Sequence, residues 1–333
     1  MRQLPVTFTG DRDEWRRLAR RDLLLNLLFT GFYTPIAKRR AGDWFLRHTQ
    51  LHGTPIEVLP VAKSRWPVVV IVVLFIALRI ATDIGFGPPL PVVIVTGLVL
   101  LPYLWRTTAA RRVDGLRWRG VQLRFVAGWA EVYRASWPLF AIGMPWAVIA
   151  PRVAESSQGG ELHFPPGLVA ALVVLVAAAL PLLVRLSFNY RRLLVTRTVA
   201  GPHSIEWDAL FGRYLAIWAT SALAFAVSVF PVVLGLRYAI FGTAAMPEGA
   251  TGWQAIAVPL AGALLAVVLS APARSWHEAR MFSLLWNNVR VGEAARFSCT
   301  LDERAFVRER GRFDKYRVKA ASVSLWVADA EKM

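Results

Sequence analysis

The chain has 333 residues, of which 56% are hydrophobic and only 18% are charged, and its 39 Lys and Arg against 22 Asp and Glu give a formal net charge of +17. This composition excludes an ordinary soluble domain and predicts a polytopic membrane protein. The positive charge is expected beside the anionic cytoplasmic leaflet of a bilayer, so nucleic acid is not expected as a partner. The single cysteine, Cys299, excludes an internal disulfide.

The N-terminal region begins with an Arg-rich segment, residues 1–21, followed by an apolar block at 23–37. The block is shorter than the roughly 20 apolar residues of a spanning helix, and Gly31 and Pro35 interrupt it. We therefore expect an interfacial or half-buried helix here, with a short membrane helix as the alternative.

Longer apolar segments follow, each close to the length needed to cross a bilayer. They predict six transmembrane helices in three hairpins, near residues 67–84, 90–105, 134–150, 167–186, 213–236 and 254–272. The expected fold class is therefore an all-α polytopic membrane protein, with short cytoplasmic strands between the hairpins. Residues 1–300 are expected to form a single integral membrane domain, and residues 301–333 a cytoplasmic C-terminal tail.

The distribution of basic residues predicts the orientation, because Lys and Arg near the ends of spans mark the cytoplasmic side. The segments between hairpins and at the two ends hold 36 of the 39 basic residues, whereas the turns within hairpins hold only Arg152 and Arg237. Both termini are therefore expected in the cytoplasm.

A pattern centred on glycine occurs once in each of the four predicted cytoplasmic segments, at Gly53, Gly120, Gly201 and Gly292. Each glycine is followed by alternating apolar residues, as in Val121-Gln-Leu-Arg-Phe125, which predicts a turn leading into a short strand. If the pattern is a true repeat, the four strands pair as a small sheet, since isolated strands are marginal. The alternative is coincidence.

Several stretches of the sequence resemble the YjgN-like family of bacterial inner-membrane proteins, a domain of unknown function. They are Phe8-Thr-Gly10, Asn26-Leu-Leu with Thr30-Gly31-Phe-Tyr33-Thr-Pro35, His48-Thr49, Leu116-Arg-Trp-Arg-Gly120-Val and Trp286-Asn-Asn288 followed by Arg296-Phe297. The chain departs from the family pattern at Pro35-Ile-Ala37 and Val113-Asp-Gly115. The resemblance implies an integral protein of the bacterial inner membrane and supplies no catalytic residue.

The sequence contains no nucleotide-binding loop and no nucleophile motif. His48 and His52 have the spacing of a helical metal site, but Gly53-Thr-Pro55 interrupts any helix there, and a solvated or capping pair is expected. We expect no enzyme and no catalytic, cofactor-binding or metal-binding residue.

Arg79 is the one basic residue well inside a predicted span, and Asp83 lies four residues further on, where the two side chains can pair on a helix. These two are candidate functional residues. The other candidate functional or structural residues are Asn26, His48, Thr49 and the four glycines Gly53, Gly120, Gly201 and Gly292.

Two functions agree with these features. The first is a scaffold or accessory protein of the inner membrane, with a basic cytoplasmic face that contacts anionic lipid and protein partners. The alternative is a small-solute transporter or channel, which the prolines within the spans favour. The sequence leaves the oligomeric state open.

Overall fold

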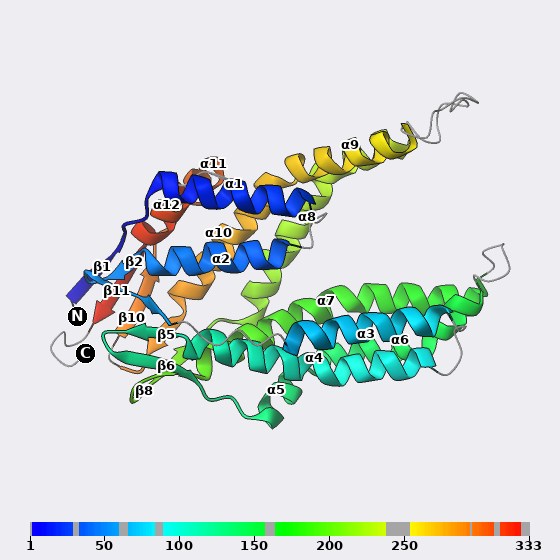
Figure 1. The fold of residues 1–333 in the computed structure, drawn as a ribbon, viewed down its shortest axis with the longest axis horizontal. Coiled ribbons are helices and arrows are strands. Elements are labelled where there is room, and N and C mark those ends of the chain that lie inside the picture. Colours follow the sequence, from blue (N-terminus) through cyan, green and yellow to red (C-terminus); the bar gives the residue numbers. More distant parts are fainter. Residues whose placement is uncertain are drawn as a thin grey trace. The chain divides into compact units, whose positions relative to one another are not determined.

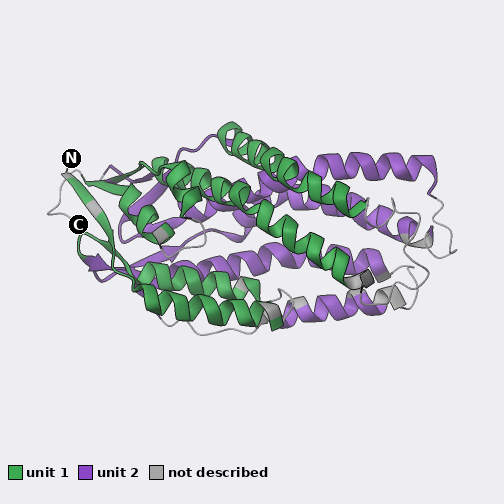
Figure 2. Ribbon diagram, turned by 90° about the horizontal axis from the view of Figure 1, so that it is seen from above, with its two compact units in different colours: residues 1–53, 212–288, 296–333 green, residues 54–211, 289–295 purple. Residues whose placement is uncertain are grey.

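The computed structural model describes residues 2–28, 33–59, 66–83, 89–156, 164–237, 254–293, 295–309 and 314–327. The chain divides into two compact units (Figure 2). Unit 1 comprises residues 1–53, 212–288 and 296–333, and unit 2 comprises residues 54–211 and 289–295.

Unit 1 contains antiparallel strands and helices of very different lengths. Its strands are β1 (Arg2–Phe8), β2 (Thr49–Leu51), β10 (Ala295–Cys299) and β11 (Val323–Val327). Its helices are α1 (Arg12–Leu28), α2 (Thr34–Arg47), α8 (Phe211–Arg237), α9 (Gln254–Leu269), α10 (Ala271–Asn287), α11 (Glu303–Arg308) and α12 (Asp314–Ser322). Strand β1 pairs with both β2 and β11, and β10 lies next to β11 (Figure 1).

Unit 2 combines a helical bundle with a row of short strands. Its helices are α3 (Trp66–Asp83), α4 (Pro89–Asp114), α5 (Trp129–Ala135), α6 (Trp137–Glu155) and α7 (Pro166–Thr196). Its strands are β3 (Thr54–Pro55), β4 (Glu57–Val58), β5 (Leu116–Trp118), β6 (Val121–Phe125), β7 (Thr198–Ala200), β8 (His203–Trp207) and β9 (Val289–Val291). Helix α3 packs on α4, α4 on α6 and α6 on α7 (Figure 1), and each strand from β4 to β9 pairs antiparallel with the next.

Each unit has an apolar core where its helices meet its strands. In unit 1, Val6 of β1 and Val323 of β11 pack with Ala279 of α10 and Phe306 of α11. In unit 2, the core lies between α4, β6 and α5, and its buried members are Ala109, Val113, Phe125, Ala127 and Val132. Burial of these side chains fixes the helix ends to the strands.

The prediction of an all-α chain with six spanning helices is wrong. Strands are an integral part of both units, and four helices in the described residues are long and apolar enough to cross a membrane by length and composition. Those four are Leu90–Asp114, Pro166–Thr196, Phe211–Arg237 and Ala257–Asn287, the last of which runs through α9 and α10.

The two other predicted spans coincide with α3 and α6, which have 18 and 19 residues. The span predicted at 134–150 crosses a break, because α5 ends at Ala135 and α6 begins at Trp137. Hydropathy did not reveal this break, since Ser136 is a small residue among apolar neighbours. The apolar block at 23–37 is likewise divided between α1 and α2, with residues 29–32 outside the described part of the chain.

Along the chain, the described residues form five modules in which two neighbouring strands flank a pair of helices or helical segments. The modules are residues 2–51, 57–118, 121–200, 203–291 and 295–327. The last module includes the segment predicted as a C-terminal tail, whose residues form α11, α12 and β11.

The strand pairing has the same register in the first four modules. In each, the last residue of the first strand is opposite the first residue of the second, giving the pairs Phe8 and Thr49, Val58 and Leu116, Phe125 and Thr198, and Trp207 and Val289. The first, second, third and fifth modules share a further feature. In each, the backbone N–H of the residue just after the first strand donates a hydrogen bond to the backbone carbonyl of the residue just before the second strand. The donor and acceptor are Thr9 and His48 (2.9 Å), Leu59 and Gly115 (2.8 Å), Val126 and Arg197 (2.8 Å), and Thr300 and Ser322 (2.9 Å). The modules are therefore structural repeats.

The four glycines of the sequence pattern lie in the turns that join one module to the next. All have a positive φ, from 51° at Gly292 to 80° at Gly120. Two of these turns have a second residue in the same region, His52 (φ 51°) before Gly53 and Arg119 (φ 48°) before Gly120. Two successive positive φ values are typical of the tight turns that suit the twist of antiparallel strands. The short strands expected after the glycines are present.

Candidate functional site

An open pocket of about 510 Å³ lies in the third module, between α5 and the last two turns of α7. Charged side chains line it, and Glu131, Arg134, Asn189, Arg192 and Arg197 are the polar residues that define it. Helix α5 begins shortly after β6 and α7 ends just before β7, so the pocket lies where the apolar α7 gives way to the strand-bearing part of unit 2.

Glu131 is held from two sides. Its Oε2 accepts the backbone N–H of Gly128 at 3.0 Å, and its Oε1 accepts a hydrogen bond from the Arg197 guanidinium. The Gly128 N–H is the main cause that lowers the pKa of Glu131 below its ordinary value of 4.5, with Arg197 and Arg134 acting in the same direction against the opposing effect of burial. Glu131 is therefore a carboxylate at neutral pH, and its charge is matched by that of Arg197.

Arg134 and Arg192 supply positive charge beyond this pair. Both side chains are exposed, and neither forms a hydrogen bond or ion pair within the part of the chain that the structure describes. The four charged residues of the pocket therefore leave a net charge of about +2 at neutral pH.

The pocket is built on a rigid corner. Ser136, at the break between α5 and α6, is fully buried, and its Oγ donates to the Val132 carbonyl at 2.7 Å. The Tyr190 hydroxyl of α7 is 2.7 Å from the same Oγ, and Asn189 Nδ2 donates to the Ala135 carbonyl at 3.0 Å. These bonds fix α5 and α6 to α7. Arg134 lies on α5 and Arg192 on α7, so the backbone positions of the two arginines are fixed relative to each other.

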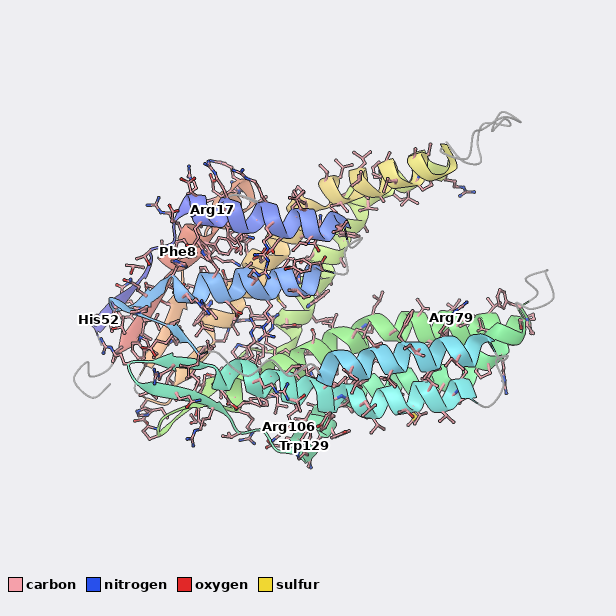
Figure 3. The ribbon with its side chains drawn as sticks, in the orientation of Figure 1. Phe8, Arg17, His52, Arg79, Arg106 and Trp129 are labelled. Atoms are coloured by element: carbon pink, nitrogen blue, oxygen red, sulfur yellow. The ribbon has the colours of Figure 1, made fainter. Side chains whose placement is uncertain are left out.

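Exposed tryptophans surround the same corner. Trp129 and Trp137 are 41% and 49% exposed. Trp129 stacks on Tyr103 with ring centroids 5.2 Å apart, and the Arg106 guanidinium lies 4.1 Å from the Trp129 ring centroid (Figure 3). Tryptophan with a neighbouring basic side chain is typical of the membrane–water interface.

A second open pocket of about 520 Å³ lies within unit 1, between α8, α10 and α11. Its charged residues are Arg213, Arg280 and Glu303. Glu303 accepts hydrogen bonds from Arg280 Nε at 3.1 Å and from Trp276 Nε1 at 2.6 Å. One carboxylate therefore neutralises one arginine here too, and Arg213 is left in excess.

The two pockets occupy equivalent positions in the third and fourth modules. Glu131 and Arg213 each lie six residues after the end of the first strand, and Asn189 and Arg280 each lie nine residues before the second. Six further lining residues correspond at the same spacing, with Arg134 matched by Ala216, Ala135 by Ile217, Arg192 by Ser283, Leu193 by Leu284, Thr196 by Asn287 and Arg197 by Asn288. Trp137 lines only the first pocket, and Thr220 and Glu303 line only the second.

The first module has a polar pair at two of these positions. Glu14 lies six residues after Phe8, as Glu131 does after Phe125, and His48 immediately precedes β2, as Arg197 precedes β7. His48 Nε2 is 3.3 Å from Glu14 Oε2, and its Nδ1 is 2.9 Å from the Trp44 carbonyl oxygen. The polar link between helix start and helix end thus recurs in the first and third modules.

The residues singled out from the sequence do not gather in one place. Arg79 is exposed on α3, near the end of that helix remote from the unit 2 strands (Figure 3), and the Asp83 side chain lies outside the described part of the structure. Asn26 Oδ1 accepts a hydrogen bond from Thr34 Oγ1 at 3.0 Å, and the buried Thr49 donates to the Phe45 carbonyl at 2.7 Å. None of these residues lines either pocket.

His48 and His52 do not share a helical face, because α2 ends at Arg47 and His52 lies in the turn between β2 and β3. Within the described residues, no group of three His, Cys, Asp or Glu side chains is placed to hold a metal ion.

Arg134 and Arg192 were not predicted as site residues from the sequence, where they appear only among the basic residues that orient the chain. The signal available was their spacing from the strands on either side, six to nine residues. That signal becomes informative only once the modules are aligned on their strand register.

Together, these features define a class of membrane protein in which pairs of helices, several of them long and apolar, are placed between paired strands. The chain belongs to the YjgN-like family, described as bacterial protein of unknown function (DUF898), whose sequence profile matches residues 3–309. The resemblance found in the sequence is thereby confirmed. No curated protein and no solved structure matches the chain.

Proposed function

We propose that the protein is an integral scaffold or accessory protein of the bacterial inner membrane, with its strands and the helix ends next to them on the cytoplasmic side. The observation that carries this proposal is the location of the charge. The segments that contain the strands and helix ends also contain 36 of the 39 Lys and Arg, and basic residues beside apolar helices favour the cytoplasmic face.

The polar groups of the apolar helices support a scaffold over the alternative, a small-solute transporter. Within the described parts of the four apolar helices, the buried polar side chains are Ser221, Ser270 and Ser275. Thr96, Thr220 and Ser228 donate to carbonyls of their own helices, at distances from 2.7 to 2.8 Å. Ser270 and Ser275 also donate to nearby backbone carbonyls, whereas the buried Ser221 hydroxyl has no hydrogen-bond partner among the described residues. A solute pathway is expected to present polar or charged side chains to one another across helices, and these hydroxyl groups do not do so.

The orientation can be tested by labelling single cysteines in intact cells. In a background with Cys299→Ser, cysteines at Gln158 and Glu248, both in predicted outer turns, should react with an impermeant thiol reagent added from outside. Cysteines at the exposed strand positions Ser204 and Arg296 should react only after the membrane is opened. Labelling of Ser204→Cys or Arg296→Cys in sealed cells contradicts the proposal.

A further inference from the structure

We propose that the pocket of the third module is a binding site for a phosphate group, with Arg134 and Arg192 as its ligand-binding residues. The phosphate belongs to an anionic molecule at the membrane surface. The inference deepens the proposed function, since it names a ligand for the basic face. It rests on charge, geometry and comparison of the modules.

The charge argument begins with the pairing inside the pocket. Glu131 neutralises Arg197, which leaves Arg134 and Arg192 exposed and without an ion-pair partner among the described residues. Guanidinium groups bind phosphate through paired, charge-assisted hydrogen bonds. Two unmatched guanidinium groups lining one pocket therefore favour an anion, and one with several acceptor oxygens.

The two arginines come from different helices that are fixed to each other. Arg134 lies on α5 and Arg192 on the last two turns of α7, and the bonds from Asn189 to Ala135 and from Tyr190 to Ser136 join these helices directly beside them. The backbone positions of both ligands are thus set before binding, which reduces the entropy lost when an anion is bound.

Comparison with the fourth module shows that the fold does not require these arginines. The equivalent positions there carry Ala216 and Ser283, while the strand register of the module is unchanged. Of the two arginines in that pocket, Arg280 is matched by Glu303 and Arg213 is in excess. Two unmatched arginines on facing helices are therefore found in the pocket of the third module and not in that of the fourth, as expected of a binding site rather than of the architecture.

A phosphate can come from a phospholipid headgroup or from a soluble molecule. The exposed Trp129 and Trp137 beside the pocket, and the apolar α7 that leads into it, favour a lipid headgroup. The site predicts no selectivity beyond the phosphate and its net charge, so an experiment must offer both sources.

The experiment uses the full-length protein in a neutral detergent and measures lipid binding by native mass spectrometry. The probes are dioleoylphosphatidylglycerol, its zwitterionic phosphatidylcholine counterpart, and inorganic phosphate as a competitor. The test variant is R134A/R192S, which copies the side chains of the next module and is therefore expected to fold. The control variant is R124Q/R296Q, which removes two exposed arginines of the strands outside both pockets.

We expect phosphatidylglycerol to bind wild type and R124Q/R296Q within about twofold of each other, and R134A/R192S about tenfold or more weakly. Phosphatidylcholine should bind all three proteins alike. If inorganic phosphate binds wild type more tightly than R134A/R192S while phosphatidylglycerol binds both alike, the phosphate site stands and its ligand is soluble. Equal binding of both probes by wild type and R134A/R192S, or equal weakening in both variants, overturns the site. Either overturning result leaves the orientation test by cysteine labelling unaffected, so the two proposals can fail separately.

Discussion

Glu131 shows how one side chain serves both a helix and a binding pocket. It accepts the N–H of Gly128 at the start of α5 and the guanidinium of Arg197 at the end of α7. An acidic residue near a helix N-terminus is favoured by the helix dipole and by the unsatisfied N–H groups there. Removing its charge therefore affects the start of one helix and the charge balance of the pocket together.

The lowered pKa of Glu131 predicts a pH-dependent stability. Because the folded-state pKa lies below the unfolded one, the carboxylate stabilises the fold above the unfolded value, and this stabilisation is lost as pH falls through the folded value. We expect Glu131→Gln to lower the free energy of unfolding at pH 7 by no more than about 1 kcal/mol, since the ion pair is exposed. The difference from wild type should shrink as pH falls below 4.5.

Thermal unfolding in detergent at pH 7 and at pH 4 measures this effect. Glu206→Gln is the matched control, because Glu206 is an exposed carboxylate on β8 that lines neither pocket. A destabilisation by Glu131→Gln that is equally large at both pH values would mean that the side chain acts by packing and not by charge.

In the turn between β5 and β6, the backbone conformation by itself explains why the residue at position 120 is a glycine. At Gly120 (φ 80°) no atom lies within 4 Å of where a Cβ would be. Substitution there meets no steric obstacle, so any loss of stability measures the cost of the left-handed backbone.

We expect Gly120→Val to lower the free energy of unfolding by about 1–2 kcal/mol, and Gly120→Asn by clearly less, because Asn tolerates a positive φ. Gly97→Ala is the control: Gly97 also has no atom within 4 Å of a Cβ, but it lies inside α4. Chemical unfolding of the four proteins compares them directly. If Val and Asn at position 120 proved equally harmful, the backbone explanation would fail.

Local sequence signals predicted the linking turns and the strands after them, because a glycine followed by alternating apolar residues is informative over a few residues. The break at Ser136 and the ends of the apolar helices were not predictable in this way. Helix α7 continues for 31 residues, past the end of its apolar part and through Arg191 and Arg192, because strand pairing and not hydropathy sets where it ends. Tertiary contacts of this kind are absent from a local pattern.

At the scale of the whole chain, only the first strand of the fifth module was predicted, and the residues from 301 onward were predicted as a tail. Its helices have 6 and 9 residues and are polar, so neither length nor hydropathy marks them. The pocket arginines, Arg134 and Arg192, were not predicted as site residues for a related reason. Their equivalence to Ala216 and Ser283 depends on the strand register, and only the structure supplies that register.

The fifth module predicts a severe effect of a small truncation. Strand β11 pairs with β1 over the register from Arg2–Val327 to Pro5–Ser324, and its residues Val323, Leu325 and Val327 are buried. Deleting residues 310–333 would expose the edge of β1 and remove part of the unit 1 core, so we expect most of the folded yield to be lost.

Size-exclusion chromatography in detergent measures the folded fraction. The matched control deletes residues 328–333 only, beyond the end of β11, and should behave as wild type. Full yield from the longer deletion would show that these residues form a dispensable tail.

The shared register of the modules has a consequence for how the protein meets bilayers of different thickness. The helices between the paired strands range from 6 residues in α11 to 31 in α7. The strand register is nevertheless the same in the first four modules, and the fifth shares the backbone hydrogen bond of the first three. A helix pair whose two ends are fastened side by side cannot adjust there, so adaptation to a thicker or thinner hydrocarbon layer must take place at the opposite tips. Adding or removing whole helical turns at those tips should retune the protein to another membrane while leaving the strands, and the pocket beside them, as they are.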